Sequence, residues 1–249
     1  DLAVDGVLLV GEHGDYPRSD TTQIVYPKRR LFGEIVDTFR KTGKVAPVFC
    51  DKHLADNWED AKWIYDQSKE MDFPLMAGSS IPGLWRYPAT DVKRDAKLEE
   101  IVGISYHTLD AYGFHGMEMI QCLAERRAGG ETGIKRVRCI TGPEVWTSDL
   151  YNRELFEKAL ERQWNQNYLR RKPLQELVKD PVLFVMDYED GLRASMLTLN
   201  GAAISWTAAW KYADETGLGV DSSLFWTQEQ RPFYHFAILL RNIESMVES

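Results

Sequence analysis

Three short apolar runs, separated by segments with helical spacing, constrain the fold of the first third of this 249-residue chain. The runs occupy residues 7–10, 45–50 and 75–78, and apolar side chains recur every three or four residues over 31–39 and 58–71. Continuous apolar runs are typical of strands that are covered on both faces, as in parallel sheets. The order strand, helix, strand, helix, strand therefore predicts a parallel βαβαβ unit with right-handed crossovers.

The remainder of the chain follows a different pattern after a boundary rich in proline, glycine and charge at residues 82–95. Alternating apolar residues before and after the Glu189-Asp190-Gly191 turn predict an antiparallel hairpin, with further strands and helices on either side of it. We therefore predict an α/β fold in which a partial Rossmann unit is followed by an α+β domain with a large, mostly antiparallel sheet. The predicted domains are residues 1–90, the C-terminal half of a dinucleotide-binding domain, and 91–249, a substrate-binding and oligomerisation domain.

Composition and charge argue against several classes of protein. The net charge is −8 and the lysines and arginines are scattered, whereas nucleic-acid binding needs a clustered basic surface. No apolar run approaches the roughly 20 residues that span a bilayer, so we expect a soluble, cytoplasmic protein without a membrane partner. Cys50, Cys122 and Cys139 form no Cys-x-x-Cys motif, which predicts reduced thiols and neither a disulfide framework nor a zinc site.

The second apolar run ends abruptly in Asp51, Lys52 and His53. Ligands of open α/β sheets collect at the carboxyl ends of the strands, so Lys52 is the first candidate for chemistry. A lysine near other cations or in an apolar pocket has a lowered pKa and can take part in proton transfer. The alternative is that Lys52 is an ordinary solvated charge.

Two motifs in the expected order resemble the Gfo/Idh/MocA oxidoreductases, the relatives of glucose-fructose oxidoreductase and inositol dehydrogenase. Residues 5–10, 48–55 and 75–78 resemble the second half of the Rossmann domain of that family, and Asp51-Lys52-His53 stands where the family has Glu-Lys-Pro. The segment Gly113-Phe114-His115-Gly116-Met117-Glu118 resembles the family's Gly-x-His-x-x-Asp segment.

The resemblance implies roles for particular residues. Lys52 and His115 would bind the substrate hydroxyl and move its proton as hydride leaves. The family's aspartate lies four residues before the histidine, at Ala111 here, so Asp110 is the candidate although it stands one position early. No metal ligand is implied. The cofactor side of the cleft would be lined by Glu12, His13, Asp51, Lys52 and His53.

A dinucleotide site also needs a glycine-rich turn between a strand and a helix, with an acid after the next strand. The glycine cluster at 129–133 follows a predicted helix instead, so we expect negligible binding of NAD or NADP by this chain alone. The start at Asp1 without a methionine predicts that the chain lacks an N-terminal part of the Rossmann domain, and that the full-length protein uses NAD or NADP. The expected substrate is a sugar or polyol.

Two other functions stay open at this point. Four histidines and three acids could serve a metal-assisted sugar isomerase or lyase, although their spacing is not diagnostic of a metal. The protein could instead be a non-catalytic sugar-binding or assembly relative that has lost redox activity. The residues concerned in the metal hypothesis are His13, His53, His107, His115, Asp15, Asp51 and Glu118.

The predicted strands also suggest how the protein assembles. Trp206, Ala208 and Trp210 share one face of a strand, and the predicted helices at 114–127 and 232–246 can cover only one face of the sheet. An uncovered apolar face commonly marks an interface. We therefore expect a homodimer or homotetramer built on residues 182–228, with Trp206 or Trp210 as anchors.

Overall fold

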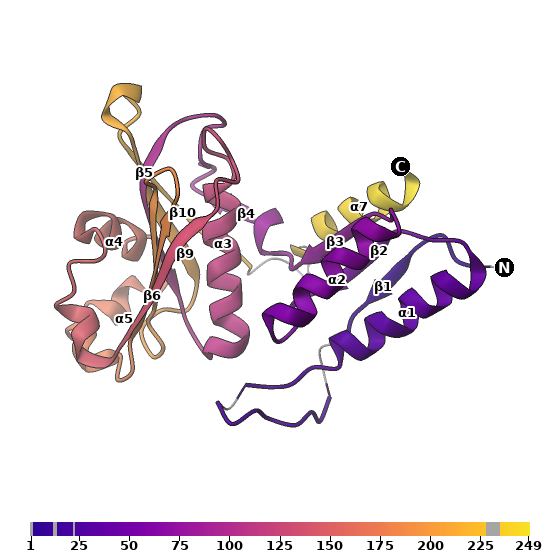
Figure 1. Ribbon diagram of the computed structural model, residues 1–249. Helices are drawn as coiled ribbons and strands as arrows, with labels where there is room; N and C mark the ends of the chain where they lie inside the picture. Colours follow the sequence, from indigo (N-terminus) through magenta and orange to yellow (C-terminus); the bar gives the residue numbers. More distant parts are fainter. Residues whose placement is uncertain (1, 12–13, 22, 228–234) are drawn as a thin grey trace. The chain divides into compact units, whose positions relative to one another are not determined.

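The computed structural model describes residues 2–11, 14–21, 23–227 and 235–249, and the chain divides into two compact units (Figure 1). The first unit consists of Asp1–Ser80 and Phe236–Ser249, and the second is Ile81–His235. Each unit has its own core, and the two are described separately.

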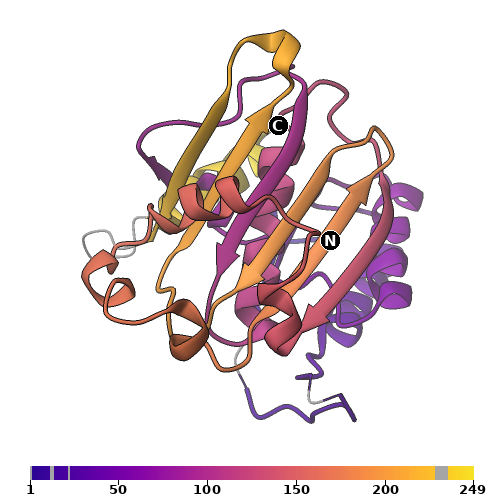
Figure 2. The ribbon, with the colours of Figure 1, turned by 90° about the vertical axis from the view of Figure 1, so that its left-hand side faces the viewer.

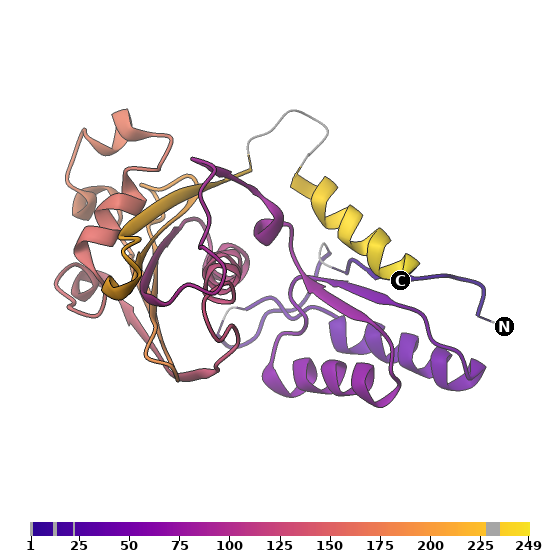
Figure 3. The same cartoon turned by 90° about the horizontal axis from the view of Figure 1, so that it is seen from above.

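The first unit contains a parallel three-stranded sheet with the order β1-β2-β3. Helices α1 and α2 cover one face of this sheet, and α7 lies on the other face (Figure 3). The bounds are β1 Val7–Leu9, α1 Lys28–Thr42, β2 Val48–Asp51, α2 Trp58–Glu70, β3 Leu75–Gly78 and α7 His235–Glu248. The predicted parallel βαβαβ unit is confirmed.

Local signals explain where these helices begin and end. Phe32, Val36 and Phe39 form the buried stripe of α1, and Gly43 ends that helix in the left-handed conformation, with φ of 66°. The side chain of Asn57 caps α2 by accepting a hydrogen bond of 2.8 Å from the backbone N–H of Asp60.

The last helix differs from the expectation. The pattern predicts a helix opened at Pro232 that covers the large sheet, but α7 belongs to the first unit, and residues 228–234 lie outside the described part of the chain. Val247 Cγ2 is 2.7 Å from the position that a Cβ on Gly6 would occupy. An apolar helical stripe shows that a helix needs an apolar partner, but it does not show which sheet provides that partner.

The second unit contains a seven-stranded sheet with the order β4-β10-β9-β5-β8-β7-β6. Neighbouring strands are antiparallel except for the parallel pair β5 and β8, which confirms the large, mostly antiparallel sheet. The bounds are β4 Trp85–Tyr87, β5 Leu98–Ser105, β6 Ile134–Thr141, β7 Val182–Tyr188, β8 Arg193–Thr198, β9 Trp206–Tyr212 and β10 Val220–Trp226.

Helices lie on both faces of this sheet (Figure 2). Helix α3, Phe114–Ala124, packs on one face, where Trp206 and Trp210 are 5% and 0% exposed in the core. Helix α4, Arg153–Leu160, and the short helices α5, Gln166–Leu169, and α6, Leu174–Leu177, lie on the other.

The expectation that Trp206 or Trp210 anchors an interface is therefore wrong. Both side chains are buried inside one chain, on the sheet face that carries α3. Alternation along a strand shows which side chains share a face, but it does not show whether a neighbour in the same chain covers that face. A homo-oligomer as such stays a prediction.

Among the described residues, no helix has the length and apolar character required to cross a membrane.

Candidate functional site

The carboxyl end of β2 carries the first group of predicted site residues. Asp51 is the last residue of the strand and is 8% exposed, and Lys52 and His53 follow it, both half-buried. The peptide bond between Lys52 and His53 is cis. The structure thus brings these three residues to the end of a parallel strand, whereas Glu12 and His13 lie outside the described residues.

Lys28 is a residue at this end of the sheet that the sequence did not single out. Its side chain is fully buried, and Nζ donates a hydrogen bond of 2.8 Å to the backbone carbonyl of Asp51. A buried ammonium group is costly unless it is hydrogen-bonded, so this contact ties the start of α1 to the end of β2. A lysine in the first turn of a helix is ordinarily exposed, and no sequence signal distinguishes Lys28 from that common case.

The second group of predicted site residues lies in the second unit, after β5. A π-helical turn, η2 at Leu109–Gly113, contains Asp110 and leads directly into α3. His115 lies in the first turn of α3, and its Nδ1 is 3.6 Å from Glu118 Oε2. The side chains of His115 and Glu118 are 12% and 13% exposed, so the carboxylate can pair with the imidazole in its protonated form. π-Helical turns occur frequently at functional sites.

Aromatic rings surround His115. The Tyr112 ring stacks on Trp206 with centroids 5.2 Å apart, and the His115 ring meets the same indole edge-on at 5.3 Å. Tyr106 packs against Trp206 at 4.9 Å, and burial raises the pKa of Tyr106 to about 12. The Tyr106 hydroxyl therefore stays protonated at neutral pH and can donate a hydrogen bond.

Ser105 holds this aromatic group in place. The Trp206 indole Nε1 donates to Ser105 Oγ at 3.2 Å, and Ser105 Oγ donates to the Tyr112 backbone carbonyl at 2.8 Å. Ser105 is fully buried as the last residue of β5, so one hydroxyl links the sheet, the indole and the π-helical turn. The sequence alone did not identify Ser105, because a single serine at a strand end carries no specific signal.

A hollow of about 480 Å³ lies at the carboxyl ends of the parallel strands β5 and β8. Thr198 is 2% exposed, and among the described residues its Oγ1 has no hydrogen-bond partner. His107 lines the hollow and packs on Tyr112 with centroids 4.5 Å apart, which connects the hollow to the rings around His115. The lining residues are His107, Leu109, Leu177, Lys179, Asp180, Val182, Thr198, Asn200 and Gly201.

The lining of this hollow suits an uncharged ligand with several hydroxyl groups. Lys179 and Asp180 carry opposite charges, and Thr198 and Asn200 can both donate and accept hydrogen bonds. The volume falls within the range of small-molecule sites.

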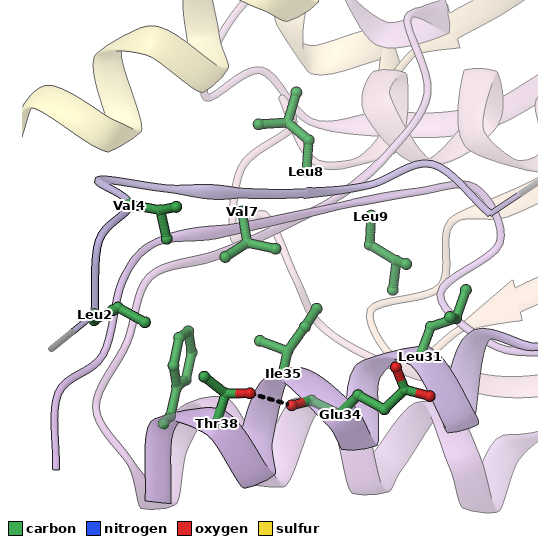
Figure 4. Close-up of a pocket in the computed structure, with 10 residues that line it drawn as sticks. Leu2, Val4, Val7, Leu8, Leu9, Leu31, Glu34, Ile35 and Thr38 are labelled. Carbon is green, nitrogen blue, oxygen red and sulfur yellow. Dashed lines mark hydrogen bonds between the residues drawn. The ribbon is translucent and has the colours of Figure 1, made fainter. Parts of the chain in front are cut away.

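A second hollow, of about 380 Å³, lies in the first unit between β1 and α1 (Figure 4). Its lining includes Val7, Leu8, Leu9, Leu31 and Ile35, of which Leu8 points away from α1. The lining is mostly apolar, with Glu34 as its one ionisable residue and Thr38 as its one hydroxyl.

The described residues give little support to a metal site or to a reactive thiol. In this part of the chain no group of three or more His, Cys, Asp or Glu side chains is placed to hold a metal ion. Burial raises the pKa of Cys50 to about 11 and that of Cys122 to about 12, so both stay as unreactive thiols at neutral pH.

No protein-family model and no curated protein matches this chain. Solved structures do share its fold. GenD2 from gentamicin A biosynthesis, in complex with NAD, is 12% identical with a TM-score of 0.54, and the match covers 92% of this chain and 56% of GenD2. Apo scyllo-inositol dehydrogenase from Lactobacillus casei is 13% identical with a TM-score of 0.55, and the match covers 99% of this chain and 69% of that enzyme.

At these identities the likeness establishes the fold alone. The chain has the two-part α/β architecture of these proteins and spans little more than half the length of GenD2. An inositol dehydrogenase is also the kind of protein that the sequence motifs around Lys52 and His115 resemble.

Proposed function

We propose that this chain is part of an NAD(P)-dependent oxidoreductase of the Gfo/Idh/MocA kind, acting on a hydroxyl or keto group of a sugar or polyol. The observation that carries the proposal is the pairing of His115 with Glu118 among aromatic rings that adjoin a polar hollow of sugar size. The fold shared with an inositol dehydrogenase and with NAD-bound GenD2 supports it.

The chemistry needs a group that handles a proton. Oxidation of a secondary alcohol to a ketone releases a hydride from carbon and a proton from oxygen. In our proposal, His115 exchanges that proton and Glu118 stabilises the imidazolium that results. Within the second unit, Thr198 and Asn200 bind further hydroxyl groups, and Lys52, after β2 in the first unit, is a candidate hydrogen-bond donor to substrate.

The described residues show no glycine-rich turn between a strand and a helix, since the β1–α1 loop holds only Gly11 and Gly14. The segment 52–57 between β2 and α2 contains no glycine. A Cβ on Gly11, after β1, would lie 2.9 Å from Leu31 Cδ1, so this glycine serves close packing on α1. We therefore assign Lys52 and His115 to substrate binding and proton handling, and we assign the pyrophosphate-binding turn to polypeptide beyond these residues.

The edge of the small sheet supports the assignment of the pyrophosphate-binding turn to further polypeptide. β1 is the outermost strand in the order β1-β2-β3, and Leu8 on it is 52% exposed. A parallel strand with apolar side chains on both faces is typical of a sheet interior. In our proposal, a further strand of the dinucleotide-binding domain pairs with β1 and covers the apolar hollow beside it.

Turnover measurements on the natural polypeptide that carries these residues test the proposal. NAD⁺ or NADP⁺ is supplied with scyllo-inositol, myo-inositol or glucose, and the reduced nicotinamide is followed by its absorbance. We expect Lys52→Met and His115→Asn each to lower turnover at least a hundredfold, whereas Lys41→Met, at an exposed position late in α1, leaves it unchanged. Normal turnover in both site variants would refute the assignment, and sugar binding without turnover would favour a non-catalytic protein.

Calorimetry on the 249-residue chain tests the missing pyrophosphate-binding turn directly. We expect no measurable binding of NAD⁺ or NADP⁺, because the sequence has no glycine-rich turn between a strand and a helix to bring backbone donors to the pyrophosphate. Micromolar affinity would contradict this and would require a cofactor site within the chain.

A further inference from the structure

Strand β6 forms one edge of the seven-stranded sheet, and no described strand pairs with its outer side (Figure 2). Six of its eight residues are exposed. Alternate residues of an edge strand direct their N–H and C=O groups away from the sheet, where a further strand can bond them. The opposite edge of the sheet is less suited to this, because β4 has only three residues and Pro88 follows it directly.

The edge strand is rich in positive charge. Ile134–Thr141 contains Lys135, Arg136 and Arg138 and no acid, although the whole chain carries a net charge of −8. Arg136 and Arg138 are two positions apart, so their side chains share one face of the sheet, the face that also carries α4. Val137 between them is 58% exposed and belongs to the other face.

The two arginines end a row of alternating charges that crosses the sheet. Asp187 of β7 accepts hydrogen bonds from Arg193 at 2.9 Å, from Arg136 at 3.0 Å and from Arg138 at 2.8 Å. In register across β9, β5, β8, β7 and β6, the row consists of Lys211, Glu100, Arg193, Asp187 and Arg136. The alternation stops at the sheet edge, so an acid would continue it in the position beyond Arg136.

Asp187 leaves positive charge at this edge. In the described part of the chain, it is the one acid that forms an ion pair with Arg136 or Arg138. The Arg136 side chain is 60% exposed, and the buried Nε of Arg138 has no hydrogen-bond partner among the described residues. A guanidinium group has five N–H donors and binds carboxylates through two of them at once, so both arginines keep donors for a second acid.

We infer that β6 is a docking edge for an extended acidic segment of another polypeptide, which adds to the sheet as a further strand. The segment bonds the outer backbone groups of β6, and two of its acids, two residues apart, face Arg136 and Arg138. The residue between these acids lies on the other face beside Val137. The sequence pattern that fits this edge is therefore acid, apolar, acid.

The same charges exclude a second copy of β6 from this edge. Pairing of two copies brings three cations from each strand together and no acid, and like charges on facing strands are destabilising. Charged side chains on an edge strand commonly prevent such self-pairing. Here the sign of the charge also selects the partner, because it favours an acidic strand over any other.

Fluorescence anisotropy with the 249-residue chain tests this inference. The probe is a labelled synthetic peptide with blocked ends, Ser-Thr-Val-Glu-Val-Glu-Val-Thr-Ser, and the comparison peptide has lysine in place of both glutamates. We expect saturable binding of the glutamate peptide and at least tenfold weaker binding of the lysine peptide. No saturable binding of the glutamate peptide up to 1 mM would overturn the inference.

Charge reversal in the protein tests the residues concerned. Arg136→Glu should weaken binding of the glutamate peptide at least tenfold and strengthen binding of the lysine peptide. The matched control is Arg30→Glu in α1, where the side chain is 66% exposed and pairs with Glu34, and it should change neither affinity. Circular dichroism verifies the fold, and Arg136→Gln replaces Arg136→Glu if the latter does not fold. Unchanged affinities in the Arg136 variants would overturn the inference.

Backbone methylation of the peptide separates strand addition from simple attraction between charges. N-methyl groups on alternate residues remove the donors along one edge of the peptide and leave its charge unchanged. Strand addition predicts that one alternate set weakens binding at least tenfold, whereas the other set is tolerated. Equal binding of the two methylated peptides would overturn strand addition and leave only a site for anions.

Discussion

Helix α3 packs tightly against the large sheet at Gly116, and adding one methyl group there tests this packing. A Cβ at Gly116 would lie 2.0 Å from Met196 Sδ and 2.9 Å from Ser105 Cβ. The Met196 side chain is flexible, but it is fully buried and has little room to move. Ser105 Cβ is fixed to strand β5, so Gly116→Ala forces the start of α3 away from the sheet.

The magnitude follows from two opposing effects. Overpacking of a well-packed core costs about 1–3 kcal/mol. Replacing glycine by alanine inside a helix stabilises the helix by about 1 kcal/mol. Because the 2.0 Å contact with Met196 is a severe overlap, we expect a net loss of about 1–2 kcal/mol in the free energy of unfolding of the second unit.

Urea denaturation followed by tryptophan fluorescence measures this loss, since Trp206 and Trp210 lie in the core beneath α3. Gly113→Ala is the matched control. Its backbone is helical, with φ of −63°, and the nearest atoms to an added Cβ are 3.8 Å away, so it should be neutral or stabilising by up to about 1 kcal/mol. Equal stability of the two variants would refute the close approach at Gly116.

Three further predictions concern single contacts. Asn57→Ala removes the cap of α2 and should cost about 1 kcal/mol in thermal denaturation, and an unchanged midpoint would contradict the cap. Ser105→Ala leaves the buried indole N–H of Trp206 without its acceptor, which should cost about 1–3 kcal/mol and shift the indole proton resonance. Burial raises the pKa of Asp190, but the hydrogen bond and charge of Arg127 together with backbone hydrogen bonds, among them that from Leu192 N–H, outweigh it, and the net pKa is lowered. The Asp190–Arg127 pair therefore stabilises the fold fully above the ordinary aspartate pKa of about 3.9, and this stabilisation is lost as the pH falls through the lower pKa that Asp190 has in the folded state. Asp190→Asn should therefore flatten the acid limb of a curve of stability against pH.

Much of the local structure was predictable from spacing. The apolar runs that became β1, β2 and β3, the caps of α1 and α2, and the turn at residues 189–191 all depend on neighbouring residues. The position of Lys52 at a strand end follows from the same pattern. These features are decided by interactions within a few residues along the chain.

The surroundings of the candidate site were not predictable in the same way. Lys28 and Asp51 are 23 residues apart, and Ser105 and Trp206 are 101 residues apart. Neither Lys28 nor Ser105 has a local signal, because the meaning of a lysine or a serine depends on what packs around it. The same holds for Thr198, whose hydroxyl has no partner in the described part of the chain, because that depends on the folded core.

The sequence by itself determined the classes of secondary structure, the parallel character of the first unit and the antiparallel character of the second, because side-chain periodicity encodes which faces are buried. Only the tertiary structure decided which element covers each face: α7 on the small sheet, and α3 over Trp206 and Trp210. Hydrophobic burial is non-directional, so an apolar face requires a cover without specifying one, and the choice depends on shape and chain connectivity. Because α3 covers its face of the sheet, Trp206 is a core residue beside His115, whereas Trp85, Tyr87 and Trp164 lie at the surface.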